Sequence, residues 1–171
     1  ADSIRYFDAD DVATTEISGF DLDSNVSFTI EEAGAEDELL VKTSTSDLDG
    51  TTLQVEDDSK SDFTTVFVFD LDTDDSINDI ELNEVAVTVV ISTTTYASVI
   101  DDAELVIDGV TIDDFTASTS VNGLVTDLVF DVDGDVTIEA GERVAAELNL
   151  RFKALAIEGT TVQGKITSAQ V

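Results

Sequence analysis

Carboxylate side chains recur at a regular spacing in this chain, and that spacing predicts cation binding. Three segments carry an Asp-x-Asp-x-(Asp/Asn) pattern directly after a phenylalanine, and in each a glutamate lies eleven residues after the first aspartate. Hard oxygen ligands at alternate positions, closed by a distant glutamate, suit Ca²⁺. We therefore predict calcium at one or more of these segments, with the ligands Asp21, Asp23, Asn25, Asp70, Asp72, Asp74, Glu81, Asp131, Asp133, Asp135 and Glu142.

The match to a helix–loop–helix calcium loop is incomplete, which leaves a second interpretation open. That loop needs glycine at its sixth position, where this chain has Val26, Asp75 and Val136. No helical pattern flanks the three segments, so a true helix–loop–helix site is excluded. The alternative is a strand whose acidic face meets water while Phe and Leu or Val point inward. It explains Phe-Asp-Leu-Asp, but not the third carboxylate.

Composition excludes most catalytic chemistry. The chain has 171 residues and a formal net charge of −32, and it lacks Cys, His, Met, Trp and Pro. Imidazole bases, thiolate nucleophiles and Cys- or His-ligated metals are therefore excluded. A paired-carboxylate mechanism has no specific signal among 39 acidic residues, and aromatic platforms for sugars are scarce. We predict that the chain is not an enzyme.

The same charge argues against two kinds of partner. Strong negative charge repels phosphate backbones and anionic headgroups, so we expect no nucleic-acid partner. No apolar run approaches the length of a membrane span, so we expect no membrane insertion by this segment. The absence of an initiator Met fits a processed chain or a fragment of a longer one.

Strict alternation of apolar and polar residues predicts strands along most of the chain. The clearest cases are 63–71, 85–91 and 144–153, and apolar residues on both faces of the first two place those strands inside a sheet. Weaker strands are expected at 26–31, 38–43, 52–56, 103–107, 124–132 and 160–168. Asp-Gly pairs at 49–50, 108–109 and 133–134 indicate turns. Residues 31–38 form the best, weak, candidate for a short helix.

These elements predict an all-β fold, an antiparallel immunoglobulin-like β-sandwich of about nine to ten strands. Residues 21–171 are expected to form this single domain. Residues 1–20 form an N-terminal arm that is a linker, an edge strand or a strand donated to a neighbouring subunit.

Charge is distributed unevenly between the two ends of the chain. Residues 1–142 hold 37 acidic and 3 basic residues, whereas residues 143–171 hold Arg143, Arg151, Lys153 and Lys165 against two glutamates. Two interpretations follow: the late basic residues balance acidic neighbours within the fold, or they meet the acidic face of another copy.

Residues 130–152 resemble a repeat unit of Asp-rich β-sandwich modules from bacterial surface-layer and cell-surface proteins. The resemblance is carried by Phe-Asp-Val-Asp-Gly-Asp-Val-Thr-Ile-Glu-Ala-Gly-Glu at 130–142 and the alternating strand that follows. The segments 105–109 (Leu-Val-Ile-Asp-Gly) and 158–162 (Glu-Gly-Thr-Thr-Val) fit the same pattern. The resemblance covers about residues 62–171 and implies an extracellular, non-catalytic, Ca²⁺-dependent lattice or stalk module.

We therefore expect an extracellular structural module of a surface layer, stalk or filament, stabilised or assembled by calcium. Its expected partners are other copies of itself or neighbouring modules of the same surface protein. The alternative is an adhesin-type ligand-binding domain at the cell surface. A halophilic protein of another function would also carry such an excess of surface aspartate.

Overall fold

The computed structural model describes residues 3–7, 13–17, 37–46, 48, 50, 52–154 and 159–166. The chain divides into two compact units, Ala1–Glu32 and Ala33–Val171. The first unit contains an antiparallel hairpin of β1 (Ser3–Phe7) and β2 (Ala13–Ile17), in which Ser3 lies opposite Ile17.

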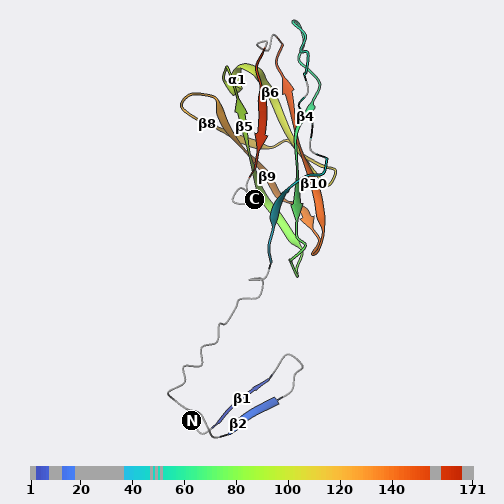
Figure 1. Cartoon of the computed structure of the whole chain (residues 1–171), viewed down its shortest axis with the longest axis vertical. Coiled ribbons are helices and arrows are strands. Elements are labelled where there is room, and N and C mark those ends of the chain that lie inside the picture. The colour runs from blue at the N-terminus through green and yellow to red at the C-terminus, as the bar shows by residue number, and fades with distance from the viewer. Residues whose placement is uncertain are drawn as a thin grey trace. The chain divides into compact units, whose positions relative to one another are not determined.

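The second unit consists of two antiparallel sheets (Figure 1). The five-stranded sheet has the order β3-β4-β10-β6-β7, and the four-stranded sheet has the order β11-β5-β9-β8. The strand bounds are β3 Leu40–Thr43, β4 Thr64–Asp72, β5 Ile80–Ile91, β6 Ile100–Ile107, β7 Val110–Ile112, β8 Phe115–Thr119, β9 Val125–Ile138, β10 Arg143–Phe152 and β11 Val162–Lys165. One helical turn, α1 (Tyr96–Val99), connects β5 to β6.

The core lies between the two sheets and follows from the period-two pattern. One face of β5 buries Val85, Val87, Val89 and Ile91, and the other strands contribute in the same way. Burial of this much apolar surface is the main favourable term in folding such a domain. The largest fully buried side chains are Phe69, Phe130, Leu71, Ile91, Leu105, Ile107, Leu128, Ile138, Leu148, Leu150, Val85 and Val87.

The predicted all-β architecture is confirmed, with nine strands in the two sheets of the second unit. Strands were expected in the regions that form β3, β4, β5, β6, β9, β10 and β11. The strand expected at 52–56 is absent, because that described segment has no ladder partner. The short strands β7 and β8 and the turn α1 were not predicted. The strand expected at 26–31 and most of the helix candidate at 31–38 lie outside the described residues.

The Asp-Gly pairs have two different roles. Asp108 (φ 48°) and Gly109 (φ 80°) form the two-residue hairpin between β6 and β7, as expected of a type I′ turn. The expected turn at Asp133-Gly134 is wrong. Both residues have positive φ, yet β9 continues to pair with β5 on either side, so they form a bulge inside the strand.

No helix in the described part of the chain is long and apolar enough to cross a membrane.

Candidate functional site

The second carboxylate segment lies on the outer face of the five-stranded sheet, where it meets two basic side chains. Asp70 and Asp72 are at the end of β4, next to Arg143 at the start of β10. The Nε atom of Arg143 lies 2.6 Å from Oδ2 of Asp70 and 3.8 Å from Oδ2 of Asp72. Lys42 reaches across from β3, and its Nζ lies 2.9 Å from Oδ2 of Asp72. We call these four residues the Arg143 quartet.

Burial makes the Arg143 quartet structurally important. Asp70 and Asp72 are only 7% and 4% exposed, and a buried carboxylate is costly unless it is paired. The hydrogen bond from Lys42, followed by the backbone N–H of Asp74, lowers the pKa of Asp72. Two of the predicted calcium ligands thus have cationic side chains as their neighbours.

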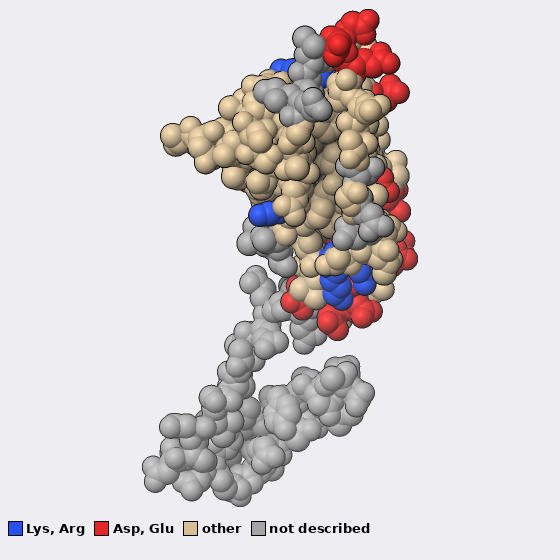
Figure 2. Space-filling model, turned by 45° about the horizontal axis from the view of Figure 1, so that its top comes forward, with Lys and Arg blue, Asp and Glu red and all other residues tan. Residues whose placement is uncertain are grey.

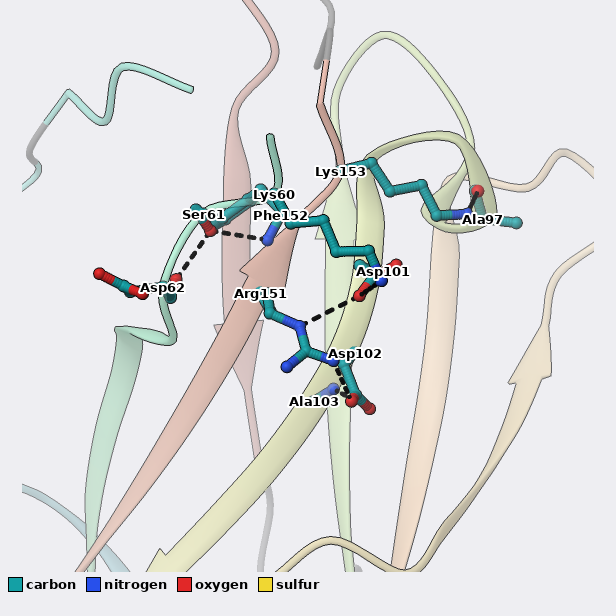
Figure 3. A network of polar contacts seen from close by, with 10 residues as sticks. All are labelled: Lys60, Ser61, Asp62, Ala97, Asp101, Asp102, Ala103, Arg151, Phe152 and Lys153. Carbon is teal, nitrogen blue, oxygen red and sulfur yellow. Dashed lines mark hydrogen bonds and ion pairs between the residues drawn. The ribbon is translucent and has the colours of Figure 1, made fainter. Parts of the chain in front are cut away.

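A second quartet holds the opposite end of the same sheet (Figure 3). Arg151, near the end of β10, lies 3.0 Å from Asp101 through Nε and 2.7 Å from Asp102 through Nη2. Lys60 Nζ lies 2.8 Å from the same Asp101 oxygen that Arg151 contacts. The Arg151 guanidinium also lies 4.8 Å from the centre of the Phe63 ring, within range of a cation–π interaction. We call Lys60, Arg151, Asp101 and Asp102 the Arg151 quartet.

The Arg151 quartet also lowers the pKa of one of its carboxyl groups. Hydrogen bonds from Lys60 and then Arg151 lower the pKa of Asp101. Each quartet combines two basic and two acidic residues, so each is neutral as a unit. The arginines of the late strand therefore balance acidic neighbours within the fold, which supports the first of the two interpretations of the charge asymmetry.

The rest of the second segment lies beyond the end of β4. Asp74 is exposed, and its backbone N–H donates to Oδ1 of Asp72 over 3.0 Å. This contact closes a local turn around Oδ1 of Asp72, while Lys42 contacts the other oxygen, Oδ2. Glu81, the glutamate of this segment, is exposed on β5.

The Asp-Gly pair of the third segment predicts a turn at the end of a strand. The structure instead places this segment inside β9. Asp131, Asp133 and Asp135 are exposed, and residues 132–135 bulge opposite the single residue Asn83. The side chain of Glu81 reaches this bulge: a Cβ built on Gly134 would lie 2.6 Å from Glu81 Oε1. The structure therefore brings the glutamate of the second segment to the bulge of the third.

A like-charge pair flanks this bulge. Glu84 on β5 lies directly opposite Asp131 on β9. Carboxylates facing each other across a ladder repel. No compensating basic residue forms an ion pair with either carboxylate among the described residues.

Glu142, the last predicted ligand, takes part in a backbone clasp that the sequence did not reveal. The fully buried Thr73 donates from Oγ1 to the carbonyl of Glu139 over 2.7 Å and accepts from the N–H of Glu142 over 3.1 Å. The backbone N–H of Thr73 donates to the carbonyl of Glu142, and Gly141 N–H donates to the carbonyl of Thr73. In the sequence, the only sign of this contact is Thr73 itself, which the structure shows to be buried between two turns.

The described residues show how most of the predicted ligands are arranged. Within them, no group of three or more acidic side chains is arranged to hold a metal ion. Asp70 and Asp72 are occupied by Arg143 and Lys42, and the others are dispersed along β5, β9 and two turns. Asp21, Asp23 and Asn25 lie outside the described residues.

Acidic side chains gather at both ends of the sandwich on the face shown in Figure 2, with basic side chains beside them. An open hollow of about 310 Å³ adjoins the Arg143 quartet and is lined by Ser44, Thr45, Ser46, Asp70, Arg143 and Ala145. Its two charged residues already pair with each other, so the hollow offers hydroxyl groups more than free charge.

The chain matches no protein-family model, and searches among curated proteins and solved structures found no match either.

Proposed function

We propose that this chain is a non-catalytic structural module of an extracellular surface layer, stalk or filament. The observation that carries the proposal is the pair of neutral quartets at the two ends of the outer face of the five-stranded sheet. Four of the seven basic residues of the chain are used to fix neighbouring strands to one another. Charges used in this way rigidify a block, and these four basic residues are engaged in structural ion pairs.

Calcium is the second part of this proposal, and it concerns the exposed carboxylates. Asp74, Glu81, Asp131, Asp133, Asp135 and Glu142 form no ion pair within the described part of the chain. The side chain of Glu81 reaches the β9 bulge, which brings a carboxylate of the second segment to the third. A divalent cation bound there would offset the repulsion between strands β5 and β9.

Thermal unfolding in Ca²⁺ and in chelator tests this part. A ligand of the folded state raises Tm, so we expect a higher Tm with millimolar Ca²⁺ than with chelator at matched ionic strength. Glu81→Gln with Asp133→Asn should abolish the difference, whereas Asp57→Asn with Asp58→Asn, exposed in a distant loop, should preserve it. Equal Tm values in Ca²⁺ and chelator would contradict the calcium proposal.

Electron microscopy of the purified chain tests the structural role. We expect ordered assemblies with Ca²⁺ and fewer or none in chelator. Monomers under both conditions would count against a self-assembling module.

The immunoglobulin-like strand order stays a prediction. Two antiparallel sheets with a shared core support it at the level of architecture. In the five-stranded sheet, β10 lies between β4 and β6.

One observation favours the alternative of an adhesin. Val121, in the loop between β8 and β9, is fully exposed, and exposed apolar side chains on loops can anchor a partner. It stands alone in that loop, however, and single exposed apolar residues are normal on protein surfaces. We therefore prefer the structural role.

A further inference from the structure

A long internal repeat links the segment around β3 to the strands that close the sandwich. Residues 38–56 align without gaps with residues 147–165, at a constant offset of 109 residues. Six of the nineteen aligned pairs are identical, and only one of the six is acidic, so acidic composition does not explain the match. The identical pairs are Glu38 and Glu147, Leu39 and Leu148, Gly50 and Gly159, Thr51 and Thr160, Thr52 and Thr161, and Gln54 and Gln163.

Conservative pairs extend the match. Val41 aligns with Leu150, Lys42 with Arg151, Leu48 with Ile157, Asp49 with Glu158 and Leu53 with Val162. Further upstream, Phe-Asp-Leu-Asp-Ser-Asn-Val-Ser-Phe at 20–28 aligns with Phe-Asp-Val-Asp-Gly-Asp-Val-Thr-Ile at 130–138, at an offset of 110. The repeat therefore follows the sequence of β9, β10 and β11.

The hairpin of the first unit continues this correspondence in structure. At an offset of 110, β1 (Ser3–Phe7) corresponds to residues 113–117 and β2 (Ala13–Ile17) to residues 123–127. These positions overlap β8 (Phe115–Thr119) and the start of β9 (Val125–Ile138), which form an antiparallel hairpin of the same kind. The two hairpins agree in strand order but not in register, since Arg5 lies opposite Thr15 whereas Phe115 lies opposite Phe130 and not Val125.

The two copies have different environments. Leu148 and Leu150 are fully buried in β10, whereas their equivalents Leu39 and Val41 are half-buried at the edge of the sheet. Leu53, the equivalent of Val162 on β11, is 42% exposed. The first copy carries the apolar pattern of core strands but is less buried than β10: Leu39, Val41 and Val55 only pack against the rim of the core.

The first copy also contains fewer strand residues than the second. Val162–Lys165 pair with β5, whereas their equivalents at 53–56 form no strand. β3 has four residues and pairs only with β4. It keeps the alternation of β10, since Val41 lies opposite the buried Leu71 and Lys42 opposite Asp70. The same side chains would therefore face a core correctly in an interior strand.

We propose that residues 38–56 are the closing strands of an adjacent sandwich of the same kind, arranged in tandem with this one. Its opening strands would be equivalents of β4, β5 and β6. The offset of 109 residues is close to the length from β4 to β11, which is the length of one sandwich. When only one set of opening strands is present, residues 40–43 pair with β4 as the edge strand β3. The inference rests on the repeat and does not depend on an extracellular role.

An extended chain tests this inference. A second copy of residues 57–109, which contains β4, β5 and β6, is placed directly before Ala1 of the full chain. We expect amide hydrogen exchange at 38–43 and 52–56 to slow by at least about tenfold, because interior strands open only with the whole domain. The added strands should become protected as well, and a second cooperative unfolding transition should appear.

Two controls make the test specific. A shuffled version of the added residues should leave exchange at 38–56 unchanged. Leu39→Asp with Val41→Asp should abolish the gain in the extended chain. In the original chain it should weaken the resident sandwich without unfolding it, because these half-buried residues pack only against the rim of its core.

The overturning results are distinct from those of the functional proposal. Unchanged exchange at 38–56 with an unprotected added segment would refute the tandem arrangement, whatever calcium does. Sedimentation of the unmodified chain adds a second check. We expect no self-association that depends on residues 38–56. If the chain instead forms dimers, and Leu39→Asp with Val41→Asp abolishes them, residues 38–56 exchange between two chains and the tandem arrangement is refuted.

Discussion

The Nε atom of Arg143 lies 2.6 Å from Oδ2 of Asp70, and this contact joins the start of β10 to the end of β4. Arg143→Met should destabilise the fold by about 1–3 kcal/mol, because it leaves a buried carboxylate without its partner. Urea unfolding measures this loss. Lys165→Met removes the same charge from an exposed site with no ion pair among the described residues, and it should have little effect.

A double substitution separates the direct interaction between Arg143 and Asp70 from the effect of the net charge of the whole chain. If the Arg143–Asp70 pair is coupled, Arg143→Met with Asp70→Asn should lose less stability than the sum of the single changes. Strict additivity would show that Arg143 acts only through net charge.

Acid should weaken the Arg151 quartet. The pKa of Asp101 is lower in the folded protein than in an unfolded chain, where a value of about 3.9 is usual. The unfolded state therefore binds the proton first, and the stabilisation by Asp101 is present above pH 4 and is lost as the pH falls through the lower folded pKa.

A variant isolates this effect from the titration of the other carboxylates. The difference in unfolding free energy between the wild-type chain and Asp101→Asn should be largest near pH 6–7 and should shrink below pH 4. Asp58→Asn, in an exposed loop, serves as the control for one lost charge. A difference that stays constant from pH 7 to pH 3 would contradict the structural role of Asp101.

Repulsion across the β5–β9 ladder can be converted to attraction. Glu84 faces Asp131, so in chelator, without a bound divalent cation, Glu84→Lys should stabilise the fold by about 0.2–1 kcal/mol and Glu84→Gln by less. The gain from Glu84→Lys should shrink in high salt, because the pair is exposed and screened. A loss of stability in Glu84→Lys at low salt would show that these carboxylates have another partner, such as a bound cation.

The sequence predicted the core well because burial follows a period of two. Val85, Val87 and Val89 could be assigned to one inner face from alternation alone, and β5 is flanked by strands on both sides as expected. The short strands β7 and β8 carry fewer buried residues than a strand pattern requires. β7 pairs with β6 through a two-residue turn and β8 pairs with the next strand, β9, so pairing rather than burial makes them strands, and they escaped prediction.

The candidate site was less predictable, because spacing does not determine which side chains meet. Asp70 and Asp72 have the spacing of ligands, but β4 extends them along the sheet toward Arg143 and Lys42. These partners are 73 residues away from Asp70 in one case and on an edge strand in the other. Asp133-Gly134 has the composition of a turn, and only its pairing with β5 makes it a bulge.

Close packing of β11 depends on a glycine without a side chain. A Cβ at Gly164 would lie 2.4 Å from Cβ of Phe67, whose ring stacks on Phe69 at 5.5 Å. Gly164→Ala should therefore destabilise the fold by about 1–3 kcal/mol through overpacking. Urea unfolding and amide exchange along 162–165 measure the effect, and the exposed neighbour change Gln163→Ala is the control. Wild-type stability in Gly164→Ala would show that β11 can move away from Phe67 at no cost.

The buried hydroxyl of Thr73 holds the turn between β9 and β10, and its removal should be more harmful than loss of its methyl group. Thr73→Val keeps the shape but removes the 2.7 Å donor to the carbonyl of Glu139, which keeps only the N–H of Glu142 at 3.1 Å. It also removes the side-chain acceptor of that N–H, and we expect a cost of about 1–3 kcal/mol. Thr73→Ser keeps the hydroxyl and should cost less, about 0.5–1.5 kcal/mol for one buried methyl group. Urea unfolding gives both values, and amide exchange at Gly141 and Glu142 should rise more in Thr73→Val. If the serine variant is the less stable of the two, packing of the methyl group outweighs the clasp.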